Sequence, residues 1–248
     1  MIKFFRNIRQ KLLSENKFSK YILYALGEIV LVVIGILIAL QINAINDRQQ
    51  DADYEIQILK EIRSSLSKDL ERTKSNLLPG LIRKEEAIAL TLKTIAYNEV
   101  DHDTVILRRD FSHIGISLNF THDRGPYESL KANGLEKISN DSLRSALVGA
   151  YEVNLPSRKT QSEQYNAENK LIREPLRDDL SVFNLVIKEK DSVFVGKSVQ
   201  FEVLKNNQNF LKYIDLDERV SRAYRQWIEE DVALYEHLIK SITSELAQ

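Results

Sequence analysis

The amino-acid sequence predicts a mainly α-helical protein, in which one transmembrane helix is followed by an extracytoplasmic helical-bundle domain. Three observations predict this class. A long apolar run lies near the N-terminus, the chain contains only 8 glycines and 4 prolines among 248 residues, and apolar residues recur at helical spacing elsewhere. The sequence has no cysteine, which excludes disulfides, zinc–thiolate sites and thiol catalysis.

Residues 21–43 form the predicted transmembrane helix. Every residue from Ile29 to Leu40 is apolar or glycine. A helix of this length is roughly 34 Å long at about 1.5 Å per residue, which suits a hydrocarbon core about 30 Å thick. A cleaved signal peptide is the rival interpretation, but the run ends in Leu40-Gln41-Ile42-Asn43 without a small-residue cleavage site.

The charges on either side of the span predict its orientation, because basic residues near a span stay in the cytoplasm. The flank after the span has Arg48 among several acids. We therefore expect residues 1–20 in the cytoplasm and residues 44–248 outside it, which in a two-membrane bacterium is the periplasm. Residues 1–20 form either an amphipathic helix on the inner leaflet or a disordered topology signal. Their bases are Lys3, Arg6, Arg9, Lys11, Lys17 and Lys20.

A stripe inside the span is the first candidate site. Small residues let two membrane helices approach closely, and a charge at this depth needs a partner, a proton or the interface. The stripe predicts a homo-oligomer within the lipid bilayer. The alternative is that glycine is simply common in membrane helices and the charge reaches the headgroups. The positions are Gly27, Glu28, Leu31, Gly35 and Ala39.

The outer domain begins with residues 44–78, which contain no glycine or proline and can continue the span as a stalk helix. The dipeptide Pro79-Gly80 predicts a stop and a tight helical hairpin. A second helix is expected over 81–97. Residues 99–125 are the least regular, with a short extended piece expected within 111–120.

Proline, glycine and helix-capping residues mark the predicted helix boundaries in the middle of the chain. Pro126 suits a helix start and Gly134 its end. Asn140 in the run Ser139-Asn140-Asp141 offers a cap for the next helix, and Pro156 marks a break or a restart. A polar helix follows until Pro175.

Residues 181–204 are ambiguous, because their valine- and phenylalanine-rich runs suit either a minor β-hairpin or short helices. The last helix is the clearest of the chain. Its apolar positions trace one face to the C-terminus. They are Leu216, Val220, Tyr224, Trp227, Leu234, Leu238, Ile242 and Leu246.

The opening stretch, MIKFFRNIRQKLLSENKFSKYILYALGEIVLVVIGILIALQIN, resembles domain-of-unknown-function family 6090, a family of bacterial envelope proteins. The run Tyr127-Glu128-Ser129-Leu130-Lys131 and Gly134 continue the resemblance. The sequence departs from relatives at Asn43-Ala44-Ile45-Asn46, where an interfacial tryptophan is common. The resemblance implies a single-pass inner-membrane protein and supplies no activity.

Few residues suggest chemistry. A zinc site needs several of His102, Asp103, Asp110, His113 and His122 to converge, yet no metal-binding spacing is present. Glycine-rich phosphate loops and nucleophile motifs are missing from the sequence. We therefore expect no enzyme, cofactor or metal, and the scattered bases predict no nucleic-acid partner.

The turn before Pro126 is the second, weaker candidate site. It combines polar groups with an aromatic residue at a helix start, where anions are favoured; the alternative is an ordinary capped loop. Its residues are His122, Asp123, Arg124 and Tyr127. The sequence thus indicates a membrane-anchored interaction or scaffold module with an unknown envelope partner. The alternative function is a small-molecule sensor that signals through a partner membrane protein.

Overall fold

The computed structural model describes residues 18–97, 113–114, 117–176, 184–188, 191–195 and 205–247. The chain separates into two compact units, Met1–Glu55 and Ile56–Gln248. Residues 1–17, which include most of the predicted amphipathic segment, lie outside the described part.

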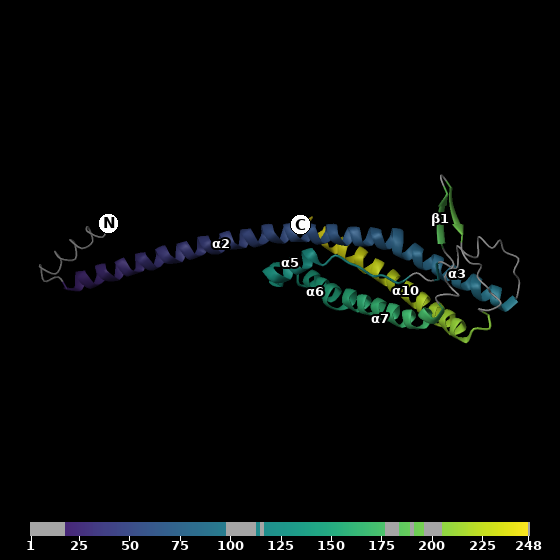
Figure 1. The fold of residues 1–248 in the computed structure, drawn as a ribbon. Coiled ribbons are helices and arrows are strands. Elements are labelled where there is room, and N and C mark those ends of the chain that lie inside the picture. Colours follow the sequence, from purple (N-terminus) through teal and green to yellow (C-terminus); the bar gives the residue numbers. More distant parts are fainter. Residues whose placement is uncertain are drawn as a thin grey trace. The chain divides into compact units, whose positions relative to one another are not determined.

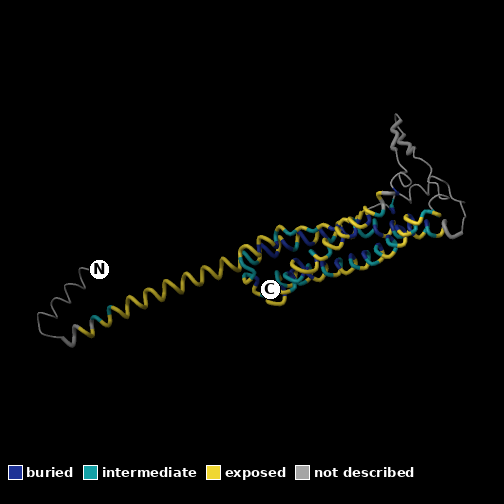
Figure 2. The backbone as a smooth tube through the Cα atoms, turned by 60° about the horizontal axis from the view of Figure 1, so that its bottom comes forward, coloured by how far each residue is buried: buried dark blue, intermediate teal, exposed yellow. Residues whose placement is uncertain are grey.

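Helix α2 runs from Phe18 to Arg72 and includes the predicted span, residues 21–43. Among the described residues it belongs to the single helical stretch that is long and apolar enough to cross a membrane, and none of its most apolar window is buried. Residues 29–53 of α2 are all exposed, and Figure 2 shows this part of the helix in yellow. An exposed apolar surface of this length is typical of contact with lipid.

The predicted hairpin at Pro79-Gly80 is wrong. A π-helical turn, η1 (Thr73–Leu77), leads directly into α3 (Leu78–Tyr97). Proline lacks an N–H and its ring clashes with a carbonyl one turn earlier. The wider π turn just before Pro79 accommodates both defects, so the chain stays helical through the proline.

The same arrangement recurs at Pro156. Helix α6 (Asp141–Val148) passes through the π turn η3 (Gly149–Asn154) into α7 (Leu155–Arg173). Pro156 lies directly after this π turn, whose wider geometry accommodates the missing N–H and the proline ring. The predicted break or restart at Pro156 is therefore wrong, because the backbone stays helical from α6 to α7.

The short helices begin and end at the predicted proline, glycine and capping residues. Helix α5 (Gly125–Asn133) has Pro126 in its first turn and ends at Gly134. The 3-10 turn η2 (Leu135–Lys137) follows. Asn140 caps α6 by accepting a hydrogen bond from the Leu143 N–H at 3.0 Å. A second 3-10 turn, η4 (Glu174–Leu176), ends the polar helix at the predicted proline.

Gly134 has a φ of 109°, a conformation that strains any residue with a Cβ. We expect Gly134→Ala to lower the free energy of unfolding by about 1–3 kcal/mol. Gly149→Ala is the matched control, because Gly149 is helical and an added Cβ meets nothing within 4 Å. That variant should be neutral or up to about 1 kcal/mol more stable. Chemical denaturation of both variants checks the difference, and equal stabilities contradict it.

Residues 184–195 contain a two-stranded antiparallel hairpin. Strand β1 (Asn184–Lys188) pairs with β2 (Asp191–Val195), with Val186 opposite Val193. Of the two alternatives left open for 181–204, the described residues adopt the extended one.

The C-terminal helix α10 (Gln208–Glu245) organises the second unit, where it contacts α3, α7 and α6 (Figure 1). The predicted inner face is partly wrong. Tyr224, Leu238 and Ile242 are buried, and the other predicted positions are half-buried. Their place is taken partly by polar residues one position away. The fully or nearly buried residues of α10 are Phe210, Tyr213, Ile214, Asp217, Ser221, Tyr224, Ile228, Asp231, Tyr235, Leu238 and Ile242.

The apolar core of the second unit lies where α3, α10 and the segment around residue 114 meet. Ile88 and Ile214 are fully buried there, and Leu92 packs against them. Ile114, Leu118 and Phe120 are also buried. The segment 111–120 therefore contributes to the core, but the predicted strand is not seen: residues 113–114 are helical, residues 117–124 adopt neither helix nor strand, and residues 111–112 and 115–116 lie outside the described part.

Candidate functional site

The buried face of α10 carries three polar residues, Asp217, Ser221 and Asp231. A buried polar group is costly unless it is hydrogen-bonded, and a buried charge needs a partner. The two aspartates meet this need by pairing with cations from α3 and α7.

Lys84 and Asp217 form a buried ion pair. The Lys84 Nζ lies 2.9 Å from Asp217 Oδ2, with side-chain exposures of 1% and 0%. The ammonium also donates to the Ile114 carbonyl at 2.5 Å. The Tyr165 hydroxyl donates to Asp217 Oδ1, and Asn169 Nδ2 donates to the same oxygen at 3.3 Å.

Burial raises the pKa of Asp217 to about 6, although the Lys84 ammonium beside it lowers that pKa. Desolvation thus outweighs the attraction of the neighbouring cation. The Lys84 ammonium therefore stabilises the charged form of the Asp217 carboxylate against the cost of burial.

Asp231 is held by Arg158 of α7. The guanidinium binds both carboxylate oxygens, with Nε–Oδ2 at 2.8 Å and Nη2–Oδ1 at 3.2 Å. The same guanidinium lies 5.2 Å from the centroid of the Trp227 ring, in cation–π geometry. Burial raises the pKa of Asp231, and the Arg158 hydrogen bonds oppose the rise.

The predicted binding turn is attached to α2 through Asp123. The Asp123 N–H donates to Asp69 Oδ2 at 2.8 Å. Its carboxylate accepts from Ser65 Oγ at 3.0 Å and from the Gly125 N–H at 2.9 Å. The Gly125 N–H, followed by Ser65, lowers the pKa of Asp123. These bonds hold the carboxylate ionised and fix it to the scaffold.

Asp69 joins the turn to the basic side chain of Arg72. The Arg72 guanidinium pairs with Asp69 and also donates to the Thr121 carbonyl at 2.9 Å. Burial raises the pKa of Asp69, while the Asp123 N–H and Arg72 lower it. The Asp69 carboxylate therefore serves chiefly as the hydrogen-bond acceptor that holds the backbone of the turn in place at Asp123.

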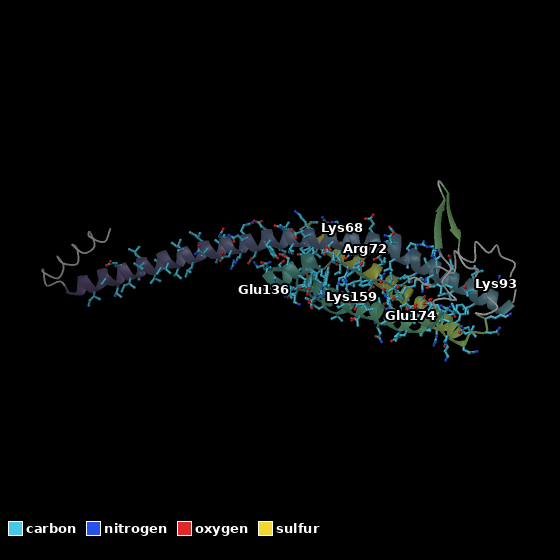
Figure 3. All side chains as sticks on the ribbon, viewed as in Figure 1. Lys68, Arg72, Lys93, Glu136, Lys159 and Glu174 are labelled. Carbon is cyan, nitrogen blue, oxygen red and sulfur yellow. The ribbon has the colours of Figure 1, made fainter. Side chains whose placement is uncertain are left out.

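His122 lies between aromatic rings. Its ring centroid is 5.6 Å from that of Phe120 and 6.4 Å from that of Tyr151. No described group hydrogen-bonds to either ring nitrogen. Burial lowers the pKa of His122, and Arg124, Lys159 and Arg72 lower it further. Figure 3 labels Arg72 on α2 and Lys159 on α7. These effects favour the neutral form of the imidazole.

Tyr127 and Arg124 have different surroundings. Tyr127 is fully buried and stacks on Tyr151, with ring centroids 4.5 Å apart and planes 6° apart. Burial, followed by the Glu152 carboxylate, raises the pKa of Tyr127 to about 12. Arg124 reaches the surface and pairs with Glu128 at 2.7 Å. The structure thus brings the four predicted residues into one region, where Asp123 forms internal hydrogen bonds, Arg124 pairs at the surface, and the ring nitrogens of His122 have no hydrogen-bond partner among the described residues.

The other candidate residues lie apart from this turn. Leu31 is exposed, and a Cβ added at Gly27 or Gly35 meets nothing within 4 Å. Among the described residues no three His, Asp or Glu side chains gather as metal ligands. His102, Asp103 and Asp110 of the considered zinc site lie outside the described part.

A family model matches residues 28–201. The chain belongs to DUF6090, a family of unknown function. The matched range includes most of the span and the whole His122–Tyr127 turn, which confirms the resemblance seen in the sequence. No curated protein and no solved structure matches this DUF6090 chain.

The buried polar residues of this DUF6090 chain were missed by the sequence interpretation. A signal for them exists on α10, because Tyr213, Asp217, Tyr224, Asp231 and Tyr235 follow the alternating three- and four-residue spacing of one helix face. That spacing, read without regard to polarity, identifies Asp217 and Asp231 as inward-facing. Lys84 on α3 carries no comparable signal.

Proposed function

We propose that this DUF6090 protein is a single-pass inner-membrane protein whose periplasmic helical unit binds another envelope protein. The main support is how the polar residues of the unit are used. Lys84, Asp217, Asp69 and Asp123 are engaged in contacts that stabilise the fold, and the proposed role requires no catalysis. The exposed apolar stretch of α2 supports anchoring in the bilayer.

The orientation follows from the charge difference across the span. The cysteine-free sequence makes single-cysteine variants direct reporters. We expect a membrane-impermeant maleimide to label Ser64→Cys, at an exposed position of α2, in cells with a permeabilised outer membrane. Ser14→Cys should react only after the inner membrane is disrupted. Labelling with the reverse pattern contradicts the proposed topology.

In-cell photo-crosslinking tests the interaction role. A photoreactive residue is placed at Leu171, an exposed position of α7, and in a separate variant at a neighbouring exposed position. Both variants should crosslink to the same envelope protein. The matched control replaces Leu155, which is fully buried in the same helix. Capture from neither surface position, or equal capture from the buried one, contradicts the proposal.

A sensor is the second candidate function. It is supported by the ring nitrogens of His122 and the hydroxyl of Tyr235, which form no hydrogen bond to any described group. Buried polar groups of this kind often receive a ligand or water. A polar small molecule that raises the melting temperature of the wild-type protein but not of Tyr235→Phe supports this role. Equal shifts in both proteins contradict it.

A further inference from the structure

An apolar seam runs along α2 beyond the predicted span. Ile42, Ile45, Gln49, Ala52 and Ile56 are separated alternately by three and four residues, the repeat of a two-stranded coiled coil. Ile45 is 59% exposed and Ile56 is 46% exposed. The predicted span ends at Asn43, so lipid does not account for the exposure of these two isoleucines.

The exposed part of the seam ends where α2 becomes part of the core of the second unit. Ile58 and Ile62 are buried there, whereas Ile56 is exposed. The next position of the repeat, Leu59, is only 1% exposed because it belongs to the core of the second unit, and the position after it is the polar Arg63. The apolar surface available to a partner helix therefore ends at Ile56.

The charges beside the seam fit a second copy in parallel orientation. In a parallel coiled coil, the residue just before the first core position of each heptad faces the residue five places later in the partner helix. Arg48, which precedes Gln49, is such a residue. This rule pairs Arg48 with the Asp53 position of the second copy. The pair is attractive. Anchoring in one membrane also requires the two copies to run parallel.

Two further features favour a helix pair. Gln49 occupies a core position, where one polar residue fixes register in coiled coils. Within the chain its Nε2 donates to Asp53 Oδ1 at 3.2 Å, which holds Asp53 beside the seam. Counting back by heptads places Gly35 and Glu28 on the same seam. A repeat this short is weak in solution, but shared membrane anchoring raises the effective concentration.

We propose that a second copy of this chain packs along Ile42–Ile56 as a parallel, left-handed coiled coil that begins at the outer end of the span and continues outside the membrane. The proposal rests on the proposed membrane anchor and deepens the proposed function by naming one partner. Oxidative crosslinking of single-cysteine variants in native membranes tests it. The full chain is used, and the cysteine-free background needs no prior change.

Ile45→Cys and Ala52→Cys should form disulfide-linked dimers roughly fivefold more than the control variants Asp47→Cys and Gln50→Cys, since only the first two lie in the seam. Asp47 and Gln50 are exposed on other sides of the same helix. Similar crosslinking at all four positions indicates random collision and overturns the proposal, as does a lack of dimer at Ile45 and Ala52.

A charge swap supplies the second arm. In the Ala52→Cys background, Arg48→Glu should lower dimer crosslinking about threefold, because the introduced carboxylate then faces the aspartate of the second copy. Adding Asp53→Arg should restore it. If the paired change fails to restore crosslinking, the proposed register is wrong. Loss of the protein from the membrane fraction instead contradicts the anchor, so the two failures are distinguishable.

Discussion

Replacing Lys84 with methionine should destabilise the second unit by about 3–5 kcal/mol at pH 7.5, because it leaves Asp217 buried without its cation. Methionine keeps most of the lysine volume, so cavity formation contributes little. Urea unfolding of the full-length protein in detergent micelles, followed by circular dichroism, measures the loss.

The destabilisation should shrink as the pH falls. The folded-state pKa of Asp217, already raised to about 6, rises further without Lys84. A raised carboxyl pKa gives a stability contribution that is fully present below the unfolded value and is lost as pH rises through the folded value. The penalty of Lys84→Met should thus be about 2 kcal/mol smaller at pH 5 than at pH 7.5, at 1.36 kcal/mol per pKa unit.

The double variant Lys84→Met/Asp217→Leu separates charge from packing. Replacing both partners of a buried pair with apolar groups is often neutral. We expect it to recover most of the stability lost in Lys84→Met. Lys93→Met, at an exposed position of the same helix (labelled in Figure 3), should change stability by less than about 0.5 kcal/mol. A double variant no more stable than the single one refutes this explanation.

Replacing Asp69 with alanine should cost about 2–4 kcal/mol, because it removes the acceptor of the Asp123 N–H and the partner of Arg72. Asp69→Asn should cost less than half as much, since its amide oxygen can still accept from the Asp123 N–H. The raised pKa of Asp69 supports this difference, because burial already disfavours the charged form.

Local exchange measurements test how Asp69 acts. The amide hydrogen of Asp123 should exchange much faster in Asp69→Ala than in the wild type, whereas Asp47→Ala on exposed α2 surface should leave it unchanged. Equal effects of the alanine and asparagine variants indicate that the charge, and not the hydrogen bond to Asp123, holds the turn.

The sequence predicts the helical elements well where local chemistry decides them. Gly134 ends α5 because of its backbone conformation, and Asn140 caps α6 through its side chain. The prediction fails at Pro79, where proline normally ends a helix but the preceding π turn absorbs the missing donor. Nothing in the neighbouring residues indicates a π turn before the packing is known.

The candidate site is predicted less well, because its pairings are long-range. Charge alone does not distinguish Lys84, which is buried against Asp217, from an exposed lysine such as Lys93. The turn at His122 is correctly singled out as a cluster of polar residues. Its attachment to Asp69 depends on a contact across more than fifty positions of sequence, which helical periodicity does not specify.

The π turn at Thr73–Leu77 also sets the rotation of the following helix, α3, about its own axis. A π turn holds about one residue more than an α turn, and each residue advances the helix by about 100°. Deleting one residue between Thr73 and Leu77 would therefore rotate every later side chain of α3 by that angle. Lys84 would leave the carboxylate of Asp217, although no residue of the pair had been changed. The extra residue is thus what sets the register between α3 and α10.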